Sequence, residues 1–196
     1  MSYVVEFSRC LLALVFLASA VSKLRGRPAF RAFVDSLRTM DLLPASVVVP
    51  LAGAVVAAEA AVPLLLVPLP VGAVTTVGFA LAASLLAGFT VAVAVVLSRG
   101  TQASCRCFGE AAAAPFGRRH LARNLVLTVV AGIGAYASLG DAGMTVQTAV
   151  LSVPLAVVGA LVVVRLDDIA ALFLPVSPPA GAARRGTARR GGRSGG

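Results

Sequence analysis

The stretch AAVPLLLVPLPVGAVTTVGFALAASLLAGFTVAVAVVLS, residues 60–98, contains no charged residue. It is too long for one membrane-spanning helix, which needs about 20 apolar residues to cross about 30 Å of hydrocarbon. Pro68, Pro70 and Gly72 interrupt it where two helices of about 25 residues would meet. The stretch therefore predicts a tight hairpin between two spans.

The composition of the whole chain agrees with this prediction. Of the 196 residues, 59% are hydrophobic and 13% are charged, and the mean hydropathy is +0.95. Soluble domains carry about 25% charged residues, so a soluble domain is excluded. Apolar runs at residues 4–22, 44–69, 71–97, 120–139 and 144–164 predict five spans. The expected fold is an all-α, polytopic membrane bundle, with a transmembrane domain at residues 1–174.

The basic residues predict an orientation. Of the 17 Lys and Arg residues, only Arg9 lies outside three regions, namely those that follow the first span, precede the fourth and follow the fifth. Five spans place these regions on one side, and cytoplasmic loops carry the excess of Lys and Arg. We expect a plasma-membrane protein with its N-terminus outside and its C-terminus in the cytoplasm. Basic residues that flank spans and form no separate domain do not indicate nucleic-acid binding.

Three segments outside this pattern have expected roles. Residues 175–196 are rich in Arg and Gly with little to bury, which predicts a disordered cytoplasmic tail. After Pro28, Phe30, Phe33, Val34 and Leu37 recur at helical spacing, which predicts a short interfacial helix that anchors the bundle to headgroups or gates a substrate. The apolar run before residues 18–20 resembles a cleavable signal, but cleavage would reverse the charge rule, so we expect the first helix to be retained.

The residues best suited to chemistry are Cys105 and Cys107, in the longest polar connection. Cysteines two apart can close a small, strained disulfide that is easily reduced. Arg106 between them would favour a thiolate, which speeds thiol–disulfide exchange. The alternative is that Cys105 and Cys107 are two ordinary free thiols in a loop. A metal site is less favoured, since His120 is the only histidine and Glu110 the only further ligand nearby.

Charges within the spans need partners. Glu59 falls near the middle of the second span, where an unpaired carboxylate is costly, and Arg9 is the expected partner. Their pairing would pin two helices together or form a proton or quinone site. Glu6 is expected to be solvated near the outer surface. Small residues are expected to permit close helix packing: Gly53, Ala57, Gly132 and Gly134.

The first span resembles the opening of the DoxX-like membrane proteins in Arg9, Phe16, Ser19, Ser22, Lys23 and Leu24, and Glu59 continues the resemblance. Cys105, Arg106, Cys107, Phe108 and Gly109 after the third span are similar to the Cys-x-Cys-Phe-Gly element of the methylamine utilisation protein MauE family. The resemblance covers about residues 5–140, and the cysteine element is its most specific part.

This resemblance implies a DoxX-like four-helix core plus one helix, and a role in maturing the methylamine dehydrogenase light subunit beside a thioredoxin-like partner. It implies that Cys105 and Cys107 are the redox pair, with Arg106, Phe108 and Gly109 in support. Arg9, Lys23 and Glu59 would be the intramembrane polar set. The charge count places the cysteines on the cytoplasmic face, whereas the maturation role would favour the outside.

Two further functions stay open. The chain could be a non-catalytic membrane assembly or transport factor in which the loop cysteines are incidental. It could also be a quinone-linked subunit, since DoxX-like proteins resemble a subunit of thiosulfate:quinone oxidoreductase. Quinone is the one cofactor candidate, and no metal is expected.

Overall fold

The computed structural model describes residues 2–67, 72–99, 118–139 and 146–172. Within these ranges the chain forms six helices and no strand. The helices, in chain order, are α1 (Ser2–Leu24), α2 (Arg27–Thr39), α3 (Ala45–Leu66), α4 (Ala73–Ser98), α5 (Arg118–Ser138) and α6 (Val146–Leu172).

Five of these helices are long and apolar enough to cross a membrane, so the predicted polytopic bundle is confirmed. They are α1, α3, α4, α5 and α6, and the candidate spans within them lie within a few residues of the predicted ones, although α6 itself continues to Leu172. The hairpin between α3 and α4 is also confirmed, since α3 ends at Leu66, α4 begins at Ala73 and the two helices pack together. Apolar side chains exposed on the bundle, such as Leu64, Val126 and Leu155, suit contact with lipid tails.

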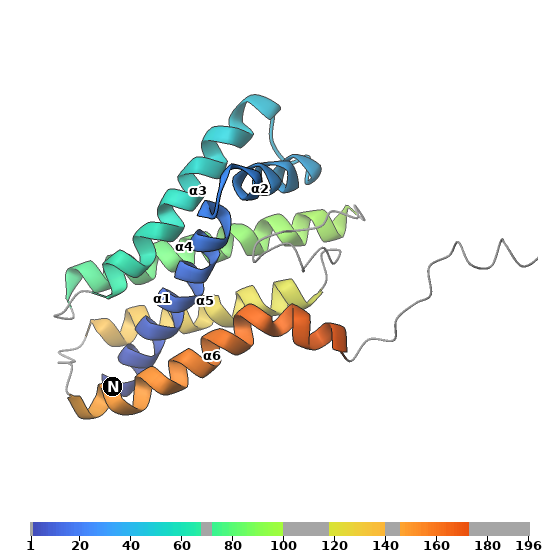
Figure 1. The fold of residues 1–196 in the computed structure, drawn as a ribbon. Coiled ribbons are helices and arrows are strands. Elements are labelled where there is room, and N and C mark those ends of the chain that lie inside the picture. The colour runs from blue at the N-terminus through green and yellow to red at the C-terminus, as the bar shows by residue number, and fades with distance from the viewer. Residues whose placement is uncertain (1, 68–71, 100–117, 140–145, 173–196) are drawn as a thin grey trace, which may run out of the picture.

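The first helix is the centre of the bundle. Figure 1 shows α1 crossing the other helices, and it packs against α3, α5 and α6 and also contacts α2. It is the most buried of the five spans. The main apolar core joins Val5, Leu12 and Phe16 of α1 to Phe79 of α4 and Ala131 of α5. This arrangement brings polar side chains of α1 into the interior.

The predicted amphipathic helix is α2, with Pro28 in its first turn. Its apolar face does not point only to lipid, because Phe33 and Val34 pack against Val48 and Ala52 in the first half of α3. Figure 1 shows α2 lying beside that half of α3. The helix therefore covers part of the bundle, while its role at headgroups stays a prediction.

The prediction that glycines permit close helix packing is confirmed at Gly134 and is wrong at Gly53 and Gly132. A Cβ at Gly134 of α5 would lie 2.4 Å from Phe79 Cε1 of α4, so only glycine admits this ring. A Cβ at Gly53 or Gly132 would meet nothing within 4 Å. Ala57 is exposed as well.

Candidate functional site

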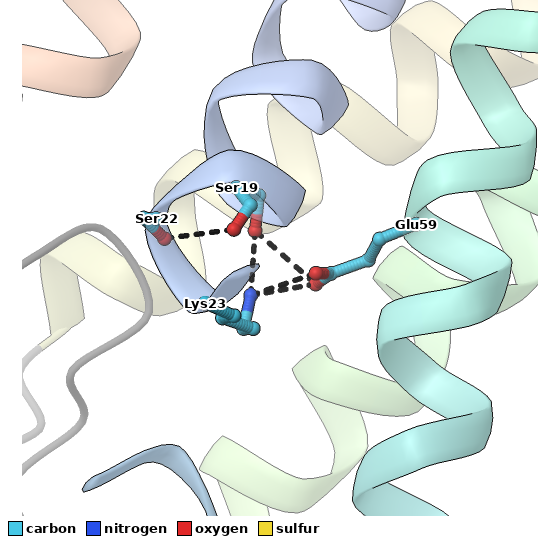
Figure 2. A network of polar contacts seen from close by, with 4 residues as sticks. All are labelled: Ser19, Ser22, Lys23 and Glu59. Carbon is cyan, nitrogen blue, oxygen red and sulfur yellow. Dashed lines mark hydrogen bonds and ion pairs between the residues drawn. The ribbon is translucent and has the colours of Figure 1, made fainter. Parts of the chain in front are cut away.

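The deepest polar contact in the described part of the bundle joins Lys23 to Glu59. Figure 2 shows Ser19 and Lys23 on the last turns of α1, with the Glu59 side chain reaching them from α3. Lys23 Nζ donates to Glu59 Oε1 at 2.9 Å and to Oε2 at 2.8 Å, and also to Ser19 Oγ at 2.7 Å. Ser19 Oγ donates to Glu59 Oε1 at 3.2 Å. Both charged residues are only 2% exposed.

This geometry gives every N–H donor of the buried Lys23 ammonium group an acceptor. A lysine has three N–H donors, and here all three have acceptors. Lys23 Nζ also lies 4.9 Å from the centroid of the Phe33 ring, at a distance that allows a cation–π attraction. Lys23 thus connects α1 to both α2 and α3.

The backbone of α3 is altered beside this pair. Pro63 lies four residues after Glu59 in α3 and has no N–H to donate to the Glu59 carbonyl. On α1, Ser22 Oγ donates to the Ser19 carbonyl at 2.7 Å, an additional bond within the last turns. The acidic side chain therefore projects from a helix that lacks one of its own hydrogen bonds.

A second buried ion pair lies nearer the start of α1. Arg9 Nη1 donates to Glu6 Oε1 at 2.9 Å, and both side chains are buried. Arg9 Nε also donates to the Leu66 carbonyl at 2.8 Å, at the last residue of α3. A cation at a helix C-terminus satisfies carbonyls without intrahelical partners and complements the helix dipole.

These contacts correct two expectations from sequence. Glu59 pairs with Lys23 rather than Arg9, because the crossing of α1 and α3 places the last turn of α1 against the interior of α3. Glu6 is 3% exposed and paired with Arg9 rather than solvated. Arg9, Lys23 and Glu59 are all buried polar residues of helices that are long and apolar enough to cross a membrane, but they form two separate clusters.

A pocket of about 40 Å³ adjoins the Lys23–Glu59 pair. Its polar lining includes Ser19 and Glu59, and its apolar lining includes Phe16, Phe89 and Met40. The remaining polar residues come from one face of α5: His120, Arg123 and Asn124. The spacing of His120, Arg123, Asn124 and Leu127 is that of a helical face, a signal that sequence reasoning did not use.

The predicted cysteine site lies outside the described residues. This applies to Cys105, Arg106, Cys107, Phe108 and Gly109, and to Glu110. Cys10 on α1 is a free, half-buried thiol. Among the described residues no group of three or more His, Cys, Asp or Glu side chains could hold a metal ion.

Comparison with known proteins gives the family. The family model described as "Methylamine utilisation protein MauE" matches residues 1–137, more than half of the chain. The chain belongs to the MauE family. The MauE match includes both buried ion pairs, the pocket and residues 105–109, while α6 lies beyond it.

A curated relative supports the MauE assignment. The chain is 42% identical over 124 residues to a protein of Paracoccus denitrificans called "Methylamine utilization protein MauE". This alignment covers 63% of the chain and 63% of the relative, so the chain spans somewhat less than two thirds of that protein. No solved structure matches the chain.

Proposed function

We propose that this MauE family member works in methylamine utilisation as a membrane-embedded partner in thiol–disulfide exchange. The observation that carries the proposal is the family match over residues 1–137, a segment that contains Cys105 and Cys107. The exchange partner is a thioredoxin-like protein, and the process served is maturation of a disulfide-containing enzyme of the methylamine dehydrogenase type.

The chemical step transfers two electrons and two protons between two dithiol/disulfide pairs. A thiolate of one pair attacks the other pair's disulfide, and a mixed disulfide forms while one thiolate leaves. The second thiol of the attacking pair then resolves the mixed disulfide, so one pair ends oxidised and the other reduced. Arg106 between the cysteines favours the attacking thiolate through its positive charge. Phe108 and Gly109 complete the element in a supporting role.

Two helices that pack against each other flank the connection that contains Cys105 and Cys107. Residues 100–117 join the end of α4 to the start of α5, and these two helices pack along each other. The pocket beside Glu59 is lined by the second half of α4 and the first turns of α5. Arg9, Lys23 and Glu59 hold α1 to α3 and so stabilise the helix bundle to which residues 100–117 are connected in the chain.

The proposed setting is the plasma membrane, with the N-terminus outside and the C-terminus in the cytoplasm. Its support is the positive-inside rule, applied to the basic residues that follow α1, precede α5 and follow α6. Residues 1–174 would form the membrane domain and residues 175–196 a disordered cytoplasmic tail whose arginines contact anionic lipid. In this orientation the cysteine pair exchanges with a partner at the cytoplasmic face.

Complementation tests the proposal. A Paracoccus denitrificans strain that lacks its own MauE protein would receive this chain, the Cys105→Ser/Cys107→Ser variant or the Cys10→Ser variant. We expect the chain and Cys10→Ser to restore growth on methylamine, and the double variant to fail at an equal protein level in the membrane. Growth with the double variant would reject the exchange mechanism. Failure of the unchanged chain to restore growth would count against its role in methylamine utilisation.

One observation favours a second function, that of a non-catalytic assembly factor. Among the described residues both buried carboxylates have a cation partner: Glu6 pairs with Arg9 within α1, and Glu59 pairs with Lys23 between α3 and α1, as expected of charges with a structural role. An assembly factor would keep its activity without the loop cysteines and would lose it when the bundle is destabilised. The double cysteine variant therefore separates the two functions.

A further inference from the structure

The pocket beside Glu59 is bounded by four helices and one turn. Val15, Phe16 and Ser19 of α1 form one wall, and Glu59 of α3 lies next to them. The other walls come from α4, α5 and Met40 after α2: Leu86, Phe89, Ala92, Val93, His120, Arg123, Asn124 and Leu127. A buried carboxylate thus faces open volume inside a membrane bundle.

The size of the pocket limits what it can hold. A cavity needs about 10–15 Å³ for one water molecule, so about 40 Å³ accommodates about three. A cavity of about 150 Å³ holds benzene, and this pocket of about 40 Å³ is much smaller, so a quinone ring does not fit without rearrangement. The pocket is therefore the right size for a short chain of water molecules.

Buried water needs two to four polar partners for each molecule. Most of the lining is apolar, and its polar residues are Ser19, Glu59, His120, Arg123 and Asn124. The Glu59 carboxylate has about four lone-pair positions, of which Lys23 and Ser19 use three. The remaining position can accept a bond from water. The Asn124 amide can donate and accept, and the titratable or charged groups nearby are Lys23, His120 and Arg123.

We propose that this pocket is a water-filled access site that connects the Glu59 carboxylate to bulk water. Its ligand is water, together with the protons that water carries. The proposal is independent of the cysteine chemistry. Glu59 then differs from Glu6, which is similarly buried and paired but is not among the residues that line this pocket.

Radiolytic hydroxyl-radical labelling of the full chain in detergent micelles tests this proposal, since radicals form only where water is present. Phe16 and Phe79 are matched probes: both are buried core phenylalanines, 4% and 0% exposed, and only Phe16 lines the pocket. We expect Phe16 to be oxidised about tenfold faster than Phe79, because water lies against its ring. Met40, also in the lining, should be oxidised as well.

Two variants and an isotope complete the experiment. Ala92→Leu fills the pocket and should lower Phe16 oxidation to the Phe79 rate, whereas Ala94→Leu, on the exposed side of α4, should not. A short exposure to ¹⁸O water before irradiation should place ¹⁸O in the oxidised Phe16. Equal oxidation of Phe16 and Phe79, no effect of Ala92→Leu, or oxidation without ¹⁸O would each overturn the proposal.

Discussion

Lys23 and Glu59 lie 36 residues apart in the chain and are joined by two hydrogen bonds of 2.9 and 2.8 Å. The pair connects the last turn of α1 to the interior of α3 in a setting where neither group meets bulk solvent directly. Removing one member leaves the other buried without its counter-charge, which costs far more than losing an exposed pair. The two helices therefore depend on both charges being present.

The first prediction concerns this pair. Lys23→Met should lower the free energy of unfolding by about 3–5 kcal/mol, because the Glu59 carboxylate is left buried and uncompensated. Thermal or denaturant unfolding in detergent micelles measures the loss. The double variant Lys23→Met/Glu59→Leu removes both charges and should recover most of the stability. A double variant as unstable as the single one would show that packing, and not the ion pair, holds α1 to α3.

The second prediction uses two arginines with the same local geometry. Arg9 pairs with Glu6 at 2.9 Å and Arg38 pairs with Asp35 at 3.0 Å, both across three residues of one helix. The Arg9 pair is buried, whereas the Arg38 pair is at least half exposed. Arg9→Met should cost about 3 kcal/mol, because Glu6 and the Leu66 carbonyl both lose a donor.

The control is Arg38→Met, which should cost no more than about 1 kcal/mol, as exposed ion pairs do. Unfolding of both variants under the same conditions gives the comparison. Similar losses for the two variants would contradict the burial of the Arg9 cluster.

The five spans could be predicted because length and hydropathy decide them locally. The partner of Glu59 could not, since it depends on how α1 crosses α3. Lys23 has the sequence position of an ordinary basic residue at a helix end, and Arg9 looked like the one cation within reach of Glu59. The crossing reverses this: Lys23 reaches Glu59, while Arg9 meets the end of α3.

The third prediction concerns the close contact between α4 and α5. Gly134→Ala should destabilise the bundle by about 1–3 kcal/mol, because the new Cβ overlaps the fully buried Phe79 ring. Gly132→Ala on the same helix meets open space and should change the stability by no more than about 1 kcal/mol. Unfolding in micelles distinguishes them, and equal losses would place the helix contact elsewhere.

These two glycines also mark a limit of sequence reasoning. Both are small residues two positions apart in an apolar helix, and nothing in the local pattern separates them. Only the rotation of α5 about its axis decides which one faces Phe79. The same rotation turns His120, Arg123 and Asn124 into the pocket. From the sequence, Arg123 was only one of the basic residues before the fourth span, His120 was a disfavoured metal ligand, and Asn124 had no predicted role.

The most direct test of the redox proposal is labelling of the loop cysteines with a membrane-impermeant maleimide in a Cys10→Ser background. Only Cys105 and Cys107 remain in this variant. We predict labelling in inverted vesicles but not in intact cells, and only after reduction, as expected of a disulfide at the cytoplasmic face. Labelling in intact cells would reverse the proposed orientation, and equal labelling with and without reduction would contradict the redox pair.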